Sequence, residues 1–312
     1  MGLLDKSFKK YIWLPFNCYF ISKKFSQFKV LDTLETLDYL QENKCSLVRF
    51  GDGDLDLITG TRDEGYQKRS DLLSQRMEEV LLTEQKNVLV CLPSAVLNYS
   101  YLKKYNDRAK FHFRTILLRY HKYLLENLSK GKLYGDAQVT RPYMDTLNKS
   151  FSKSVFEGFK RLFGANRIIL VEGEKTRFGV GNDLFGNARQ IMRILAPAVN
   201  AFDKYDEILK KTLEVVSELE KQGSKKEDIL FVLALGPCAK LLTLELSKLG
   251  YRALDVGHLD IEYEWFLREG TTKKISIPGK YVNEAKDGKV WSGDSNIDLE
   301  QYKKEIVARV GI

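Results

Sequence analysis

The stretch "ILFVLALGPCAKLLTLELSKLGYRALDV", residues 229–256, contains two short apolar runs on either side of a helix-like segment. The runs are residues 229–235 and 252–256, and between them residues 240–249 place apolar side chains three and four positions apart. Continuous apolar runs of this length are typical of strands that are covered on both faces. The stretch therefore predicts a strand, a helix and a second strand of one parallel sheet.

The same alternation extends over most of the chain. Further apolar runs occupy residues 46–50, 87–92 and 167–171, and further helix-like segments occupy residues 71–82, 187–195 and 204–221. This pattern predicts an α/β, Rossmann-like fold whose mostly parallel sheet carries helices on both faces. No internal repeat or low-complexity linker divides the chain, so we expect one domain over residues 31–312, preceded by a separate segment, residues 1–30.

Composition limits the classes of protein to which the chain can belong. Of its 312 residues 44% are hydrophobic and 12% aromatic, which is ample for a large core and excludes a disordered chain. Fifty basic residues against 42 acidic ones give a net charge of +8, which suits an anionic partner such as nucleotide phosphate, a lipid surface or nucleic acid. The four cysteines are widely spaced without a CxxC pair, which indicates a reducing, cytoplasmic environment.

The first 30 residues are basic and aromatic. The run "YIWLPFNCYFI", residues 11–21, is shorter than the roughly 20 apolar residues of a membrane span. Residues 1–30 contain six lysines and Asp5 as the only acid, which suits an anchor at the surface of an anionic membrane, such as the inner face of the cell membrane. The alternative is an N-terminal element that packs on the domain. No small-residue cleavage site follows the run, so we do not expect a secretory signal.

The residues that follow the predicted strands form a candidate ligand site, because ligands of parallel sheets bind beyond the carboxyl ends of the strands. In "RFGDGD", residues 49–54, Gly51 and Gly53 let the backbone approach a ligand closely, and Arg49 can bind a phosphate. Asp52 and Asp54 can accept hydrogen bonds from ribose or sugar hydroxyls. The alternative is an ordinary turn, which Asp-Gly pairs also favour.

A second candidate element is the helix start at "GPCAK", residues 236–240. A glycine turn, a proline in the first helical position and a lysine one turn later are typical of a phosphate-binding helix terminus, although an ordinary strand–helix connection has the same pattern. Together these elements predict a nucleotide-binding set of Arg49, Gly51, Asp52, Gly53, Arg76, Arg141, Glu172, Lys175, Gly236, Pro237 and Lys240.

Four groups that bind protons or metals occupy alternate positions in "DVGHLDIEYEWF", residues 255–266. Carboxylates packed together destabilise a protein unless a positive charge lies among them. Mn²⁺ or Mg²⁺ on the diphosphate of a nucleotide sugar would supply that charge, and we expect His258, Asp260 and Glu262 as its ligands. The alternative is a solvated acidic edge.

Several motifs together resemble the bacterial glycosyltransferases of the GT-D fold. They are "RFGDGD", "RSDLLSQR" (residues 69–76), "YGDAQVTRPY" (134–143), "VEGEKTRFGVGNDLF" (171–185), "ALGPCAK" (234–240), "LDVGHLDIEYEWFL" (254–267) and "GKYVNE" (279–284). The resemblance implies transfer of a sugar, typically glucose, from a UDP-sugar to a glycan acceptor with Mn²⁺. The basic, aromatic N-terminal segment suits an enzyme that works on a membrane-linked glycan, so we expect a role in the assembly of a surface polysaccharide, with a lipid-linked acceptor, or of a glycoprotein.

The resemblance also implies roles for particular residues. The metal motif of the family falls on Asp260, Glu262 and His258, and its nucleotide-sugar loop falls on residues 49–54, where many relatives have Glu in place of Asp54. We expect Asp54 and Asp260 among the catalytic residues, and Glu264 either as the base that activates the acceptor, which we favour, or as a carboxylate that supports the metal ligands. Two other classes stay open at this point, a metal-dependent phosphohydrolase of nucleotide sugars and a non-catalytic nucleic-acid-binding module. The acid-rich motifs disfavour the second.

Overall fold

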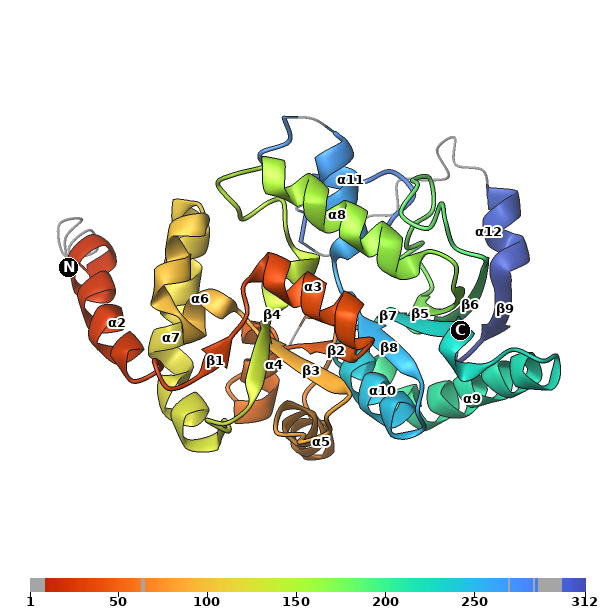
Figure 1. Cartoon of the computed structure of the whole chain (residues 1–312), viewed down its shortest axis with the longest axis horizontal. Helices are drawn as coiled ribbons and strands as arrows, with labels where there is room; N and C mark the ends of the chain where they lie inside the picture. The colour runs from red at the N-terminus through yellow and green to blue at the C-terminus, as the bar shows by residue number, and fades with distance from the viewer. Residues whose placement is uncertain (1–8, 63–64, 269, 283, 286–298) are drawn as a thin grey trace.

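The computed structural model describes residues 9–62, 65–268, 270–282, 284–285 and 299–312. Nine strands form one sheet in the order β1-β4-β3-β2-β8-β7-β5-β6-β9 (Figure 1), and every described strand pair is parallel. This confirms the predicted α/β fold with a parallel sheet. The strands are β1 (Lys29–Val30), β2 (Ser46–Arg49), β3 (Val88–Leu92), β4 (Leu133–Asp136), β5 (Arg167–Gly173), β6 (Gln190–Ala196), β7 (Ile229–Ala234), β8 (Arg252–Asp255) and β9 (Ile306–Arg309).

Helices cover both faces of the sheet, with α3 and α8 on one side and α4, α5 and α10 on the other (Figure 1). Alternate residues of a strand enter different cores, as the pleat requires: in β7, Leu230 belongs to one core and Phe231 to the other. The helices are α2 (Leu14–Lys23), α3 (Thr33–Asn43), α4 (Asp52–Thr59), α5 (Asp71–Leu81), α6 (Ser94–Leu97), α7 (Asp107–Asn127), α8 (Ser150–Phe163), α9 (Tyr205–Lys221), α10 (Pro237–Lys248), α11 (Leu259–Leu267) and α12 (Leu299–Glu305), with one π-helical turn, η1 (Lys9–Trp13).

One predicted element is wrong. The expected helix at residues 187–195 is the strand β6, which pairs with β5 on one side and β9 on the other. The spacing of its apolar residues fits both a helix and a strand. The pairing with β5 and β9 on its two edges makes the segment a strand. Arg193 in this strand is buried, with its guanidinium bound to Glu172 and Glu305.

The N-terminal segment, residues 1–30, begins with eight residues that lie outside the described part of the chain. From Lys9 onward it forms η1, α2 and β1. Helix α2 packs against α7 at one end of the molecule (Figure 1). No helix in the described ranges combines the length and the apolarity that crossing a bilayer requires.

Candidate functional site

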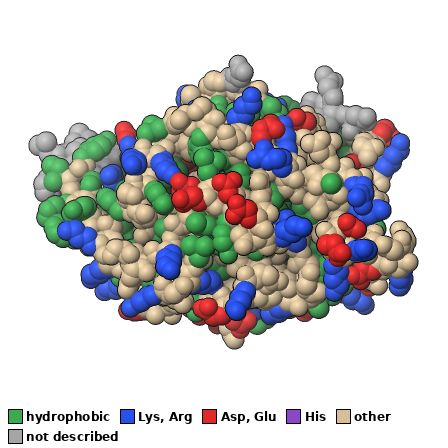
Figure 2. Space-filling model, in the orientation of Figure 1, with side chains coloured by type: hydrophobic (Ala, Val, Ile, Leu, Met, Phe, Trp, Pro, Cys, Tyr) green, Lys and Arg blue, Asp and Glu red, His purple; other side chains and the backbone are tan. Residues whose placement is uncertain are grey.

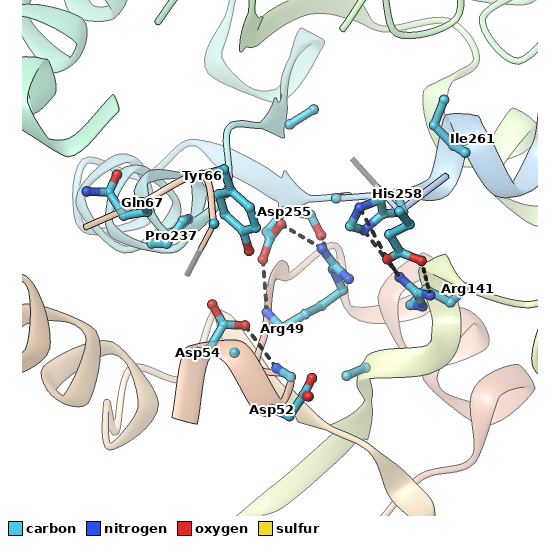
Figure 3. A pocket seen from close by; sticks show the side chains of 18 of the residues that line it. Arg49, Asp52, Asp54, Tyr66, Gln67, Arg141, Pro237, Asp255, His258 and Ile261 are labelled. Carbon is cyan, nitrogen blue, oxygen red and sulfur yellow. Dashed lines mark hydrogen bonds and ion pairs between the residues drawn. The ribbon is translucent and has the colours of Figure 1, made fainter. Parts of the chain in front are cut away.

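A cavity of about 620 Å³ lies at the carboxyl ends of the central strands. Its walls come from the residues that follow β2, β4, β5, β7 and β8, together with one face of α7, so segments distant in the sequence meet at one edge of the sheet, as parallel topology requires. Of the predicted residues, the lining includes Arg49, Gly51, Asp52, Gly53, Asp54, Arg141, Gly236, Pro237, Lys240 and His258 (Figure 3 labels several of them).

A first group of charged side chains, the Arg49 cluster, consists of Arg49, Asp54, Lys240 and Asp255. The Arg49 guanidinium donates to Asp255 Oδ1 at 2.9 Å and to the Asp255 carbonyl at 2.7 Å (Figure 3). Lys240 Nζ lies 3.0 Å from Asp54 Oδ1 and 3.5 Å from Asp255 Oδ2. Two cations and two carboxylates therefore tie the ends of β2 and β8 to the starts of α4 and α10.

Burial acts to raise the pKa of Asp255, but the charges of Arg49 and Lys240 outweigh it and hold that pKa below its ordinary value. A carboxyl whose pKa is lower in the folded state stabilises the fold above its unfolded pKa, about 3.9 for Asp. That contribution is lost as the pH falls through the folded pKa. Asp255 is therefore ionised at neutral pH, and the two cations that lower its pKa, Arg49 and Lys240, are held beside the cavity.

This linkage predicts a pH-dependent effect of Asp255→Asn. The variant should unfold at lower urea concentration than the wild type at pH 7, and the difference in free energy of unfolding should shrink as the pH falls below about 4. Asp71→Asn, at an exposed aspartate in the first turn of α5, should show no such narrowing. If the free energies of unfolding of Asp255→Asn and the wild type differ by the same amount at every pH, the linkage is contradicted.

Glycine is required at two turns that border the cavity. Gly257 has φ +48°, and a Cβ atom there would lie 1.9 Å from Arg49 Nη2. Gly236, before α10, has φ +53°, and a Cβ atom would lie 2.9 Å from the ring of Tyr66. These glycines let the Arg49 guanidinium and the Tyr66 ring lie directly against the backbone at the ends of β8 and β7.

A second group, the Glu284 cluster, consists of Arg141, His258, Lys274 and Glu284. Both terminal nitrogens of Arg141 bind the Glu284 carboxylate, which also binds Lys274. His258 Nε2 lies 3.4 Å from Glu284 Oε1, and its Nδ1 lies 3.3 Å from Arg141 Nη1 (Figure 3). Burial acts to raise the pKa of Glu284, but Arg141 and His258 lower it well below its ordinary value, which makes this carboxylate a poor base.

The predicted metal ligands do not converge. His258 precedes α11 and lines the cavity, whereas Asp260 is buried and accepts from Lys280 Nζ at 2.7 Å and from the Gly179 amide at 2.9 Å. Glu262 points elsewhere, with Oε2 accepting from the amides of Tyr143 and Met144 and with Oε1 buried without a hydrogen-bond partner. Within the part of the chain that the structure describes, no three His, Cys, Asp or Glu side chains are placed to hold a metal ion. The set His258, Asp260 and Glu262 does not fit a shared ion in this arrangement.

Glu264, predicted as the base, is also directed away from the cavity. It accepts from Lys280 Nζ at 2.9 Å and from Asn182 Nδ2 at 2.7 Å, and it forms an ion pair with Arg268. Because residues 259–267 are helical, Asp260 and Glu264 lie on one face four positions apart. The cation between these two carboxylates is therefore the buried ammonium of Lys280.

Three residues predicted to bind the nucleotide lie outside the cavity lining. Glu172 is buried and pairs with Arg193 at 2.8 Å. The Arg76 guanidinium lies over the ring of Tyr205, 4.5 Å from its centroid. Lys175 contributes its backbone carbonyl, which accepts from the Tyr281 amide at 2.9 Å. Each followed a predicted strand or belonged to a recognised motif, but the local backbone directs its side chain away from the cavity.

Sequence reasoning also missed several cavity residues. Asp255 was read as part of an apolar run, although it is the last residue of its strand and so stands at the edge where ligands bind. Glu284 stood in a recognised motif without an assigned role. Other missed lining residues lie in loops and in α7, where no local pattern marks them; among them are Tyr66, Gln67, Arg108, His112, Lys274 and Tyr281.

Known proteins share this chain's sequence pattern over its central part. The sequence profile of the glycosyltransferase GT-D fold matches residues 47–285, which is most of the chain and includes every strand that borders the cavity. The chain belongs to the GT-D fold glycosyltransferases. This confirms the resemblance of the motifs and makes the cavity at the strand ends the candidate active site of a glycosyltransferase.

Two curated relatives match almost the whole chain. "Probable glycosyl transferase Gly" of Streptococcus gordonii is 37% identical over 288 residues, which cover 91% of this chain and 39% of that protein. The glycosyltransferase GlyD of Streptococcus pneumoniae is 35% identical over 283 residues, which cover 88% of this chain and 32% of that protein. The chain thus spans about a third to two-fifths of the length of these relatives.

Two solved structures share the fold. One, of domain of unknown function 1792, is described as having a distinct glycosyltransferase fold; its TM-score is 0.82 at 36% identity, covering 94% of this chain and 100% of that one. The other, described as a new glycosyltransferase from Streptococcus sanguinis, has a TM-score of 0.78 at 34% identity and covers 90% of this chain and 99% of that one.

Proposed function

We propose that this glycosyltransferase moves a hexose, with glucose favoured, from a UDP-sugar to a glycan acceptor in bacterial surface polysaccharide or glycoprotein assembly. The observation that carries the proposal is that one cavity at the strand ends is lined by two clusters that contain cations and by an aromatic side chain. Arg49 and Lys240 belong to one cluster and Arg141 and Lys274 to the other, and Tyr66 lies beside the start of α10.

The donor would lie with its diphosphate toward the start of α10. The positive end of the helix dipole and the fixed charges of Arg49 and Lys240 would stabilise the negative charge that builds on the departing UDP. The ring of Tyr66, packed on Gly236, offers a flat surface on which the uracil base can stack. Arg49 and Lys240 are already ordered by the contacts of the Arg49 cluster, so little reorganisation of these cations accompanies the reaction.

The acceptor hydroxyl needs a base, and Asp52 is the carboxylate best placed for that role. It lines the cavity at the start of α4, and its side chain is 35% exposed. Its carboxylate oxygens lie 3.7 Å from His112 Nε2 and 3.8 Å from Arg62 Nη2. In the transfer the acceptor oxygen bonds to the anomeric carbon, the bond from that carbon to the β-phosphate oxygen breaks, and the acceptor proton passes to Asp52.

The Mn²⁺ or Mg²⁺ of the family resemblance stays a prediction. The three residues expected to bind it are engaged elsewhere or separated, so we assign no step to a metal. The proposed chemistry rests on the fixed cations and on Asp52.

Release of UDP tests the proposal. We expect one UDP-sugar of a panel to yield UDP in the presence of a glycan acceptor, and Asp52→Asn to slow that release by about 100-fold or more. Asp71→Asn changes an aspartate at the same position of α5, outside the cavity, and should leave the rate unchanged. Each sample is assayed with Mn²⁺ and with a chelator.

The outcomes separate the alternatives. UDP release that does not depend on an acceptor would indicate a hydrolase and contradict the transferase. Equal rates for Asp52→Asn and Asp71→Asn would remove Asp52 from the reaction.

A further inference from the structure

The outward face of α2 and the turn before it carries a concentration of exposed apolar side chains. Of the 16 large hydrophobic residues exposed in the described part of the chain, six lie within residues 11–20. Five of these define what we call the aromatic face, and each is between 44% and 63% exposed: Ile12, Trp13, Phe16, Tyr19 and Phe20. Figure 2 shows hydrophobic side chains gathered at the end of the molecule where Figure 1 places α2. So much exposed aromatic surface on one helix is typical of an interaction site.

The opposite face of the same helix is fixed to the domain. Leu14 and Cys18 are buried against the core, and Cys18 Sγ donates to the Arg114 carbonyl of α7 at 3.3 Å. The Tyr99 hydroxyl donates to the Pro15 carbonyl at 3.3 Å. The inner face of α2 therefore packs on the domain, as the alternative prediction for this segment expects. The aromatic face takes no part in that packing and stays exposed.

The charge around the aromatic face has one sign. The sequence contains no Asp or Glu between Lys6 and Leu31, whereas it contains five lysines after Lys6 in that interval. Lys23 Nζ lies 4.8 Å from the centre of the Tyr19 ring and 5.4 Å from that of Phe20, and Lys23 and Lys24 are both exposed. The apolar surface is thus bordered by exposed ammonium groups.

We propose that the aromatic face docks this enzyme on the surface of an anionic lipid bilayer. Trp and Tyr rings favour the level of the lipid headgroups, and lysines beside them bind anionic headgroups. An amphipathic segment of this kind lies in the plane of the interface with its apolar side chains inserted. The proposal does not depend on which sugar is transferred or on the roles given to cavity residues.

A second copy of the chain is the less favourable occupant. Two aromatic faces packed together would bring lysines against lysines, and no acidic side chain of the segment would compensate them. A bilayer with anionic lipids supplies the opposite charge over the whole face. Charge complementarity therefore selects the lipid surface.

The place of α2 also relates the bilayer to the cavity. Helix α7 binds α2 through the Arg114 carbonyl, and the same helix contributes Arg108, His112 and Ile116 to the cavity wall. A docked enzyme would hold the cavity one helix away from the lipid surface. An acceptor attached to a lipid would then be delivered beside the active site.

Vesicle sedimentation tests the proposal. The full chain is mixed with sucrose-loaded vesicles of phosphatidylcholine alone or with phosphatidylglycerol, and the pelleted fraction is measured. We expect the mixed vesicles to bind at least about tenfold more strongly, and K23E/K24E to lose that preference. K303E/K304E makes the same charge change on α12, at the other end of the molecule (Figure 1), and should bind as the wild type does.

A second variant tests the apolar contribution. Trp13→Ser combined with Phe16→Ser and Phe20→Ser should also release the protein from mixed vesicles, while its melting temperature and its UDP-sugar turnover without vesicles stay those of the wild type. The proposal is overturned if the wild type does not bind mixed vesicles. It is also overturned if K23E/K24E and K303E/K304E bind them equally. If light scattering finds the wild type dimeric and the triple variant monomeric, the aromatic face binds a second copy of the chain and the proposal is overturned.

Discussion

Arg49→Met is expected to reduce UDP-sugar turnover by about 100-fold to 1000-fold, the usual cost of removing one fixed group that stabilises charge in a transition state. Arg49 binds Asp255 through its guanidinium at 2.9 Å and lies under Gly257, so its charge is held at the edge of the cavity. Without it, Asp255 loses its strongest partner and Lys240 faces two carboxylates. The loss should appear in kcat at saturating donor as well as in kcat/KM.

The matched control is Arg189→Met, which removes an exposed arginine outside the cavity. It should keep wild-type turnover. Because Arg49→Met also removes a partner of a buried carboxylate, its melting temperature must be measured, and turnover is compared at a temperature where both variants are folded. Wild-type turnover by folded Arg49→Met would contradict the role given to the Arg49 cluster.

Lys280→Met is expected to lower the free energy of unfolding by about 3–5 kcal/mol, the usual cost of removing one partner from a buried ionic group. The ammonium of Lys280 is almost wholly buried and lies 2.7 Å from Asp260 Oδ2 and 2.9 Å from Glu264 Oε1. Its removal leaves two carboxylates four residues apart on one helix face with Asn182 and Arg268 as their remaining side-chain partners. Urea unfolding at pH 7 measures the change.

Two further variants define the cause of that loss. Lys303→Met, at an exposed lysine of α12, should change the free energy of unfolding by less than about 0.5 kcal/mol. Adding Asp260→Asn to Lys280→Met should recover part of the loss, because one of the uncompensated charges is then gone. A Lys280→Met variant as stable as Lys303→Met would contradict the account of this ion-pair group.

The fold could be predicted because each central strand has a sequence pattern that is recognisable from a few neighbouring residues. Each central strand is a short apolar run, and a glycine, a proline or a charged residue follows each run, as Gly236 does after residues 229–235. The strand β6 was mispredicted because its apolar spacing also fits a helix, and only its pairing with β5 and β9 distinguishes the two. Pairing between strands is a property of the whole sheet, which a local pattern does not contain.

The site was predictable only in part, for a physical reason that α11 illustrates. His258, Asp260 and Glu262 were predicted to share one metal ion and Glu264 to act as the base, but the helix turns these side chains to different partners. His258 meets Glu284, Glu262 meets two amides, and Asp260 and Glu264 meet Lys280. Both Lys280 and Glu284 come from the segment that returns over α11. Its position depends on tertiary packing, which spacing along the sequence does not determine.

Calorimetric titration of UDP into the wild type, Tyr66→Ala and Leu72→Ala, with Mn²⁺ in one buffer and a chelator in the other, tests whether the donor binds in this cavity. We expect UDP to bind the wild type and Tyr66→Ala to bind it about tenfold more weakly, because the variant loses the ring on which the base stacks. Leu72 is exposed on α5 outside the cavity, so Leu72→Ala should bind as the wild type does. No binding of UDP in either buffer, or equal affinity for all three proteins, would contradict the placement of the donor in this cavity.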